Sequence, residues 1–355
     1  MKVNGQLALR KARDFIAAQG GEIAPLAISE EELNPDTQDD LTLQAEPLES
    51  TNSVYDVPYE YPKDSNCSEF RFFEDGRQRT IQVGHIRATY PDNLILIPVH
   101  FFIVAAVILE RTDRKLTLWK GPLIKQGIFV PKSLVPNQSL LDEFEQSGLN
   151  VIDTEAEDAG TPADYYDMRR RALRRAKDLR LSVEQELIGE WRKDSAAADN
   201  FLIVDGTLMN MRDERNVDRC IGVSKSFGSR YFEISKHNQI MQMKECQRSW
   251  TFRFHDPEGD LRKGVRERTS WYLRLRDKRR ADPEFGLIRV EISKKYISEA
   301  APKADRFSRS LLSERLPTAY PAPRWDKHLY PIRGCETYLS SVMPSIPTIT
   351  AAMQG

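Results

Sequence analysis

The order of elements between residues 163 and 206 constrains the fold of this chain most strongly. Residues 163–193 place apolar side chains every three to four positions, which predicts one long amphipathic helix. The positions in this repeat are Leu173, Ala176, Leu179, Val183, Leu187 and Trp191. Residues 201–206 then read FLIVDG, a segment typical of a strand buried on both faces of a sheet. A long helix that leads into such a strand is typical of an α/β protein.

Short strand-like segments on both sides of this helix and strand complete the prediction of the fold. Before it we expect strands in residues 68–75, in residues 80–86 and in the apolar run Leu94–Leu109, with turns at Asp75–Gly76 and Thr112–Asp113. After it, strands are predicted at Trp250–Phe254, Trp271–Leu275 and Leu287–Ile292, and helices elsewhere at residues 5–19, 139–146 and 325–341. The predicted fold class is α/β, with a mixed central β-sheet flanked by helices.

Length and cysteine usage exclude several classes of protein. The apolar run Leu94–Leu109 spans 16 residues and contains Pro98 and His100, so it is too short and too interrupted for a membrane span. The four cysteines form no CxxC pair, which argues against a disulfide scaffold or a structural zinc site. The N-terminus lacks the apolar core of a secretion signal, so we expect a cytoplasmic protein. A GxxxxGK[ST] phosphate loop is also lacking, which argues against an ATPase.

Residues 22–62 have a distinct composition, with eleven carboxylates and no lysine or arginine. This charge imbalance predicts a solvated, partly disordered segment. The alternative is an acidic arm that docks on a partner's basic surface or shields a basic groove of this chain. We therefore divide the 355 residues into an N-terminal helix with an acidic extension, residues 1–66, and a main domain, residues 67–355.

Positive charge gathers in two later parts of the chain, although the net charge is only −1. The long helix opens with a run of arginines that includes Arg174 and Arg180. Between Arg212 and Arg280 there are 18 Lys/Arg against 10 Asp/Glu, and eight aromatic residues are interleaved with them. Lysine and arginine side chains that neutralise phosphates, together with aromatic rings that stack on bases, suit a nucleic-acid groove. A solvated helix face is the more ordinary explanation of a run of arginines.

Two aspartates end strand-like segments in an Asp-Gly pair, namely Asp75 in FRFFEDG and Asp205 in FLIVDG. Each pair taken singly is most often a simple turn. Ligands of open α/β sheets nevertheless gather at strand ends, and a third carboxylate could come from the long helix. Glu184 borders the apolar face of that helix, while Glu186 and Glu190 are alternatives. Such a cluster would bind hard divalent cations, and two ions about 4 Å apart would suit phosphodiester hydrolysis.

Three further residues could contribute to such a site. Lys225 follows the apolar segment CIGVS and could contact a phosphate as a point charge. Near the C-terminus, Tyr320 could orient a phosphate or water, and His328 could bind a metal or assist the leaving group. Each of the three could equally be an ordinary surface or core residue.

In this order, these residues resemble the NurA family of nucleases. The resemblance spans residues 68–345, and its most specific part is IVDGTL followed by GVSKS. The other matching features are the Asp-Gly pair at Asp75, the helical segment LRLSVE at Glu184, and a late Tyr320-Pro321 followed by His328.

The resemblance implies an RNase H-like core and a manganese- or magnesium-dependent active site. It also implies 5′–3′ exonuclease and single-strand endonuclease activity, in a homodimer that works with a HerA-type hexameric ATPase on DNA ends during repair or phage defence. Asp75, Glu184, Asp205 and His328 would hold the metal and Tyr320 would complete the site. Lys225 would be the basic residue near the phosphate, with Arg180 and Arg174 as further phosphate contacts.

Three alternatives stay open at this point. Glu74 or Asp326 could replace one of the expected metal ligands, because the first motif reads Glu-Asp-Gly-Arg and the last reads Trp-Asp-Lys-His. The chain could instead be an inactive nuclease-like scaffold that binds and stimulates the ATPase. It could also be another RNase H-like enzyme, such as a nuclease of RNA–DNA hybrids.

Overall fold

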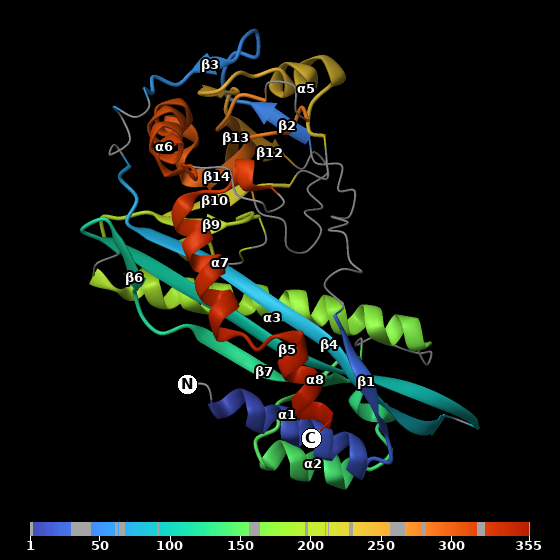
Figure 1. The fold of residues 1–355 in the computed structure, drawn as a ribbon. Helices are drawn as coiled ribbons and strands as arrows, with labels where there is room; N and C mark the ends of the chain where they lie inside the picture. The colour runs from blue at the N-terminus through green and yellow to red at the C-terminus, as the bar shows by residue number, and fades with distance from the viewer. Residues whose placement is uncertain are drawn as a thin grey trace.

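A computed structural model describes most of the chain and shows one large mixed β-sheet flanked by helices (Figure 1). The described residues are 3–29, 44–60, 63, 68–90, 92–155, 164–195, 198–209, 211, 213–226, 230–255, 267–278, 282–317 and 324–354. The fold class predicted from the sequence is confirmed at this level.

The centre of the sheet has the strand order β7-β5-β4-β9-β10. The bounds are β4 Phe72–Tyr90, β5 Asn93–Thr112, β7 Leu123–Val130, β9 Leu202–Asp205 and β10 Cys220–Ser224. Strands β4, β5 and β7 form an antiparallel meander, whereas β9 runs parallel to both β4 and β10. The predicted strand at FLIVDG is therefore central, with a paired neighbour on each side.

The sheet continues beyond this centre in both directions. After β10 come β14 Leu287–Ser293, β13 Arg268–Arg274, β12 Phe252–His255 and β2 Gln44–Pro47, and β8 Val151–Asp153 lies at the other edge. Outside this path, β1 Glu22–Ser29 pairs with β4, β6 Lys115–Leu118 pairs with β5, and β11 Gln247–Arg248 joins β13 to β3 Tyr55–Asp56.

Two helices cover opposite faces of the central strands. These are α3, Tyr165–Lys193, and α7, Tyr330–Val342, which crosses in front of the strands in Figure 1. Because side chains alternate along a strand, Phe72 packs with Trp191 of α3 while the next residue, Phe73, belongs to the cluster of α7. The long helix predicted from the apolar repeat is confirmed.

The remaining helices cover the two ends of the sheet. Helices α1 Val3–Ala18, α2 Gln138–Gln146 and α8 Ile346–Gln354 lie together at one end, and α6 Ala300–Glu314 packs near β13 at the other (Figure 1). Shorter helices are α4 Glu214–Val217, α5 Ile234–Met241 and the 3₁₀ segments Lys132–Leu134, Lys294–Glu299 and Trp325–Lys327. No described helix combines the length and the apolar character that crossing a lipid bilayer requires.

One of the two predicted turns is wrong. Asp75 and Gly76 do not turn the chain, because they lie inside β4 and pair with Val107 and Ala106 of β5. The turn after Thr112 is confirmed: Asp113 and Arg114 have φ values of 50° and 65° between the paired strands β5 and β6. The Asp-Gly pair at residues 75–76 therefore lies inside a continuous strand and does not mark a turn.

The acidic N-terminal segment is more structured than its composition predicts. Residues 22–29 form β1 against β4, and residues 44–47 form β2 against β12. The carboxylate of Glu49 binds the buried guanidinium of Arg248 at 2.8 Å. For these parts the interpretation as a solvated, disordered extension is wrong, because strand pairing and a buried cation bind them to the body. Residues 30–43 lie outside the described part of the chain.

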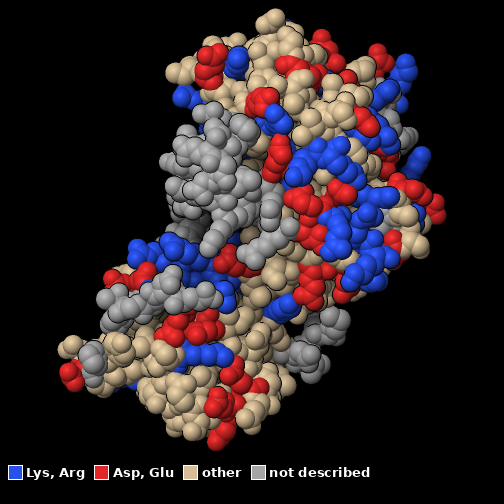
Figure 2. Space-filling view, turned by 180° about the vertical axis from the view of Figure 1, so that it is seen from behind, with Lys and Arg blue, Asp and Glu red and all other residues tan. Residues whose placement is uncertain are grey.

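In the described parts of residues 212–280, several of the basic side chains are buried and cannot face a nucleic-acid groove. Arg248, Arg268 and Arg274 are buried at 1% exposure or less, where their donors bind carboxylates and backbone carbonyls. The interleaved aromatics Trp250, Phe252, Trp271 and Tyr272 are likewise buried core residues. On the face shown in Figure 2, carboxylates lie among the lysines and arginines.

Candidate functional site

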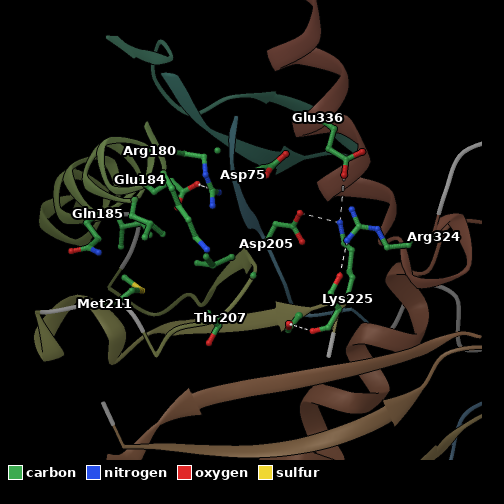
Figure 3. A pocket seen from close by; sticks show the side chains of 18 residues that line it. Asp75, Arg180, Glu184, Gln185, Asp205, Thr207, Met211, Lys225, Arg324 and Glu336 are labelled. Carbon is green, nitrogen blue, oxygen red and sulfur yellow. Dashed lines mark hydrogen bonds and ion pairs between the residues drawn. The ribbon is translucent and has the colours of Figure 1, made fainter. Parts of the chain in front are cut away.

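A cavity of about 350 Å³ opens where β9 and β10 end, between α3 and α7. Figure 3 shows acidic and basic side chains pointing into it from β4, α3, α7 and the ends of β9 and β10. The labelled lining residues are Asp75, Arg180, Glu184, Gln185, Asp205, Thr207, Met211, Lys225, Arg324 and Glu336. This strand-end position is the place where α/β sheets commonly bind ligands.

Three carboxylates converge in this cavity, from Asp75, Asp205 and Glu336. Each offers one oxygen, and these oxygens all lie within 4.8 Å of one another. Glu74 is in register with Val204 across the parallel pair β4–β9, so the following residues, Asp75 and Asp205, project side by side on the same face. Helix α7 covers that face and adds Glu336. The predicted pair Asp75 and Asp205 does meet, and Glu336 is the third member that sequence reasoning missed.

Helix α7 is fixed on the sheet by the apolar residues that flank Glu336. Ile332, Cys335 and Leu339 are completely buried at a helical spacing of three to four, and the Cys335 sulfur lies 3.5 Å from the Phe73 carbonyl oxygen. Glu336 borders this apolar stripe, so its carboxylate reaches the strand ends. The same position beside an apolar stripe was the reason for selecting Glu184, so the signal was present in the sequence.

Lys225 supplies a positive charge inside the acidic cluster. Its ammonium donates to Asp205 at 3.0 Å and to Glu336 at 3.4 Å, and the residue is only 7% exposed. Burial disfavours the charged form, but Asp205, Glu336 and Asp75 together raise the pKa of Lys225. The lysine predicted to lie near a phosphate is therefore located at the acidic cluster itself.

His328 lies beside Glu336 and is not among the residues that line the cavity. Its Nδ1 atom is 3.6 Å from the Glu336 carboxylate, which also accepts a hydrogen bond from Arg333 at 2.7 Å. Burial and the charge of Lys225 lower the pKa of His328, which favours the neutral imidazole. His328 contacts the third carboxylate and is not one of the three converging acids.

Burial and mutual repulsion make the cluster difficult to ionise fully. Burial, followed by the charge of Asp205, raises the pKa of Asp75 well above its usual range. Glu336 behaves differently: burial opposes its ionisation, but Lys225, Arg333 and His328 together lower its pKa. The three acids could hold a cation, because added positive charge would offset the repulsion between the carboxylates.

Glu184 lines the same cavity but is held by its own partner. Its carboxylate accepts a hydrogen bond from Arg180 at 2.7 Å, one helical turn earlier on α3. It lies directly over Gly76, where an added Cβ would be 1.9 Å from the Glu184 Oε1 atom. Gly76 is needed for this close approach. The other two candidates on α3, Glu186 and Glu190, are exposed.

Glu74 and Asp326, the two possible substitute ligands, lie in surroundings different from those of the three converging acids. Glu74 is completely buried on the α3 face of β4, and both its carboxylate oxygens are without a hydrogen bond among the described residues. Burial and the neighbouring Glu184 and Asp75 raise the pKa of Glu74 well above its usual range. Asp326 accepts a hydrogen bond from the Gly286 backbone at 2.6 Å. Neither belongs to the group of three converging acids.

The loop after Asp205 is fixed by two buried charged residues. Glu291 accepts hydrogen bonds from the Thr207 hydroxyl and from the Leu208 backbone nitrogen, each within 3.0 Å. Arg268 donates to the Leu208 carbonyl oxygen at 3.2 Å, and Gly206 has a φ of 112° that favours glycine. The Asp205 side chain is thus positioned by residues of β13 and β14.

Two remaining predictions concern residues away from the cluster. Arg174 is exposed on α3, two positions on the N-terminal side of Ala176. Tyr320 lies outside the described residues. Comparison of the sequence with models of protein families and with curated proteins finds no match.

Proposed function

We propose that this chain is a divalent-metal-dependent nuclease that hydrolyses phosphodiester bonds of DNA. The observation that carries the proposal is the convergence of Asp75, Asp205 and Glu336 beside Lys225, in a cavity that is also lined by Arg180 and Arg324. Carboxylates suit a hard cation, and the surrounding cations suit an anionic substrate. The resemblance to NurA nucleases, stated above, supports the same assignment.

The donor set fits Mn²⁺ or Mg²⁺. Oxygen ligands from carboxylates are those that Mg²⁺ and Mn²⁺ prefer, and no cysteine lines the cavity in the described residues. When bound, such an ion would polarise a phosphoryl oxygen and lower the pKa of a coordinated water. Asp75, Asp205 and Glu336 would hold it, while Lys225 orients the last two through its hydrogen bonds.

The basic residues at the rim would bind the substrate backbone. Lys177 and Arg180 approach from α3, and Arg324 approaches from the opposite side of the cavity. Positive groups on both sides of the acids would hold consecutive phosphates and so centre one of them over the carboxylates. The strand order β7-β5-β4-β9-β10, an antiparallel meander extended by parallel strands, is compatible with the proposed RNase H-like core.

The direct test is cleavage of fluorescent single- and double-stranded DNA with Mn²⁺ or Mg²⁺, with and without EDTA. We expect Asp205→Ala to abolish cleavage while the circular-dichroism spectrum and the oligomeric state stay unchanged. Asp178→Asn removes an exposed acid of α3 and should cleave like the wild type. Full activity of the Asp205 variant, or cleavage that persists in EDTA, would exclude the proposal.

One observation favours a second candidate, a non-catalytic scaffold. The Lys225 ammonium bridges Asp205 and Glu336, so a cation of the chain itself already neutralises part of the cluster. A scaffold of this kind would bind nucleic acid and a partner without cutting. Binding of DNA with no metal-dependent cleavage, for both single-stranded and hybrid substrates, would favour it over the enzyme.

The cellular setting and the assembly are part of the same proposal. By its resemblance, the chain would act as a homodimer beside a HerA-type hexameric ATPase that feeds DNA ends to it. Co-purification with such an ATPase, and stimulation of its ATP hydrolysis, would test the partnership separately from cleavage. Digestion of an RNA–DNA hybrid beside DNA would test the third alternative.

A further inference from the structure

The basic residues that line the cavity differ in whether a carboxylate pairs with them. Arg180 is paired with Glu184 at 2.7 Å, and Lys225 is paired with Asp205 and Glu336. Arg324 donates from Nη1 to the Ser226 hydroxyl at 2.7 Å and, in the described part of the chain, forms no ion pair. None of the described carboxylates therefore forms an ion pair with Arg324, although it lies beside an acidic cluster.

The position of Arg324 is fixed by contacts with the end of β10. The Lys327 ammonium donates to the Lys225 carbonyl oxygen at 3.1 Å, and the Lys327 backbone nitrogen donates to the Arg324 carbonyl oxygen at 3.0 Å. Figure 3 shows the Arg324 side chain pointing from the C-terminal segment toward Lys225. The residue is exposed, so a large anion can reach its guanidinium from solvent.

We propose that Arg324 and Ser226 bind a backbone phosphate of the nucleic acid next to the phosphate that lies over Asp75, Asp205 and Glu336. The inference rests on the proposed nuclease function and names a residue that sets the register of the strand. A guanidinium can donate two parallel hydrogen bonds to a phosphate. The Ser226 oxygen accepts from Arg324, which leaves the hydroxyl hydrogen of Ser226 to donate to the same phosphate.

Arg114, an arginine with the same left-handed backbone conformation as Arg324, provides a matched control. The φ of Arg324 is 61°, in the left-handed region, and Arg114 in the β5–β6 turn is an exposed arginine with a φ of 65°. Arg114 does not line the cavity. Replacing either arginine by alanine removes one exposed charge at a left-handed position, so a difference between the two variants reports on the site and not on backbone strain or net charge.

The first measurement is the affinity of the full chain for a fluorescein-labelled single-stranded 20-mer, by anisotropy in Ca²⁺ or EDTA where it is not cut. We expect Arg324→Ala to lose about 10- to 100-fold in affinity, the range for a hydrogen bond to a charged group. Its salt slope should fall by about 0.7, the value for one phosphate of a single strand. Arg324→Lys should recover the slope but only part of the affinity, and Arg114→Ala should match the wild type.

The second measurement locates the phosphate. A series of oligonucleotides carries one neutral methylphosphonate at each linkage in turn, and a parallel pair differs in a 5′-phosphate or a 5′-hydroxyl. We expect a methylphosphonate at one internal linkage to weaken binding by the wild type but to cause no further loss of affinity in Arg324→Ala. If only the 5′-phosphate behaves in this way, the site binds strand ends, and the internal assignment is wrong.

The two proposals can fail separately. If the wild type cuts DNA with Mn²⁺ but Arg324→Ala keeps the wild-type affinity and salt slope, the phosphate site is refuted while the nuclease stands. If the wild type does not cut, the nuclease proposal fails, and the binding data still decide whether Arg324 contacts phosphate. Equal losses in Arg324→Ala and Arg114→Ala would also refute the site, because they would show a general charge effect.

Discussion

Neutralising Glu336, the acid that sequence reasoning missed, should remove the response of this protein to divalent metal. Glu336→Gln keeps the shape of the side chain but deprives the cluster of one of its three carboxylates. It also loses ion pairs with Lys225 at 3.4 Å and Arg333 at 2.7 Å. Because Glu336 is partly exposed and Asp205 still pairs with Lys225, we expect a loss of only about 1–2 kcal/mol in unfolding free energy.

The size of the metal effect follows from linkage. A ligand at 100 times its dissociation constant stabilises the folded chain by about 2.7 kcal/mol. Unfolding entropy of about 2.1 cal/mol/K per residue gives a 355-residue chain about 0.75 kcal/mol/K, so Mn²⁺ should raise the wild-type Tm by about 4 °C. The same Mn²⁺ should move the Tm of Glu336→Gln by less than about 1 °C, since a site with two carboxylates would be far from saturation.

Differential scanning fluorimetry of EDTA-treated protein over a MnCl₂ series would measure both shifts. The matched control is Glu186→Gln, which removes an exposed acid of α3 and its 2.7 Å ion pair with Lys125 outside the cluster. It should shift with Mn²⁺ like the wild type. Equal Mn²⁺ shifts in the wild type and in Glu336→Gln would refute the assignment of Glu336 as a ligand, and no shift in the wild type would refute the metal site.

Three further predictions concern the structure around the site. Gly76→Ala should displace the Glu184 carboxylate and lower the unfolding free energy by about 1–3 kcal/mol, measured in urea, because its Cβ would lie 1.9 Å from Oε1. Trp191→Ala should cost about 3–5 kcal/mol in the same assay, since this completely buried ring packs on Phe72. Burial would raise the pKa of Glu49, but hydrogen bonds from Arg248 and the Thr251 backbone lower it. Its stabilising contribution should thus be complete above about pH 4.3 and disappear as the pH falls through the lower folded pKa, so the stability difference between wild type and Glu49→Gln should shrink in acid.

The elements that were predicted from the sequence are those whose signal is local. The apolar repeat of α3 and the uninterrupted FLIV of β9 depend on side chains a few residues apart, so periodicity was sufficient to find them. Asp205 followed from the same signal because it ends a strand that is buried on both faces. Asp75 was selected for a wrong local reason, since the expected turn is a continuous strand, yet strand pairing still places it beside Asp205.

The features that sequence reasoning missed depend on pairs far apart in the chain. Arg248 is buried because it meets Glu49 and Asp305, which are 199 and 57 residues away, and composition alone cannot separate such an arginine from one on the surface. For this reason, the interpretation of Arg248 as part of a basic groove is wrong. Glu336 was missed because its helix follows Asp205 by more than a hundred residues, although the apolar stripe beside it was visible in the sequence.

The charges in the cavity bear on how many divalent ions the proposed enzyme would use. Three carboxylates and the Lys225 ammonium leave two negative charges, which one divalent cation would neutralise. A second ion about 4 Å away would require Glu184, the helical acid predicted as a ligand, but Arg180 already neutralises that carboxylate. We therefore infer that the arrangement favours one metal ion at the three acids, with Arg324 providing the positive charge that a second ion would otherwise bring to the phosphate.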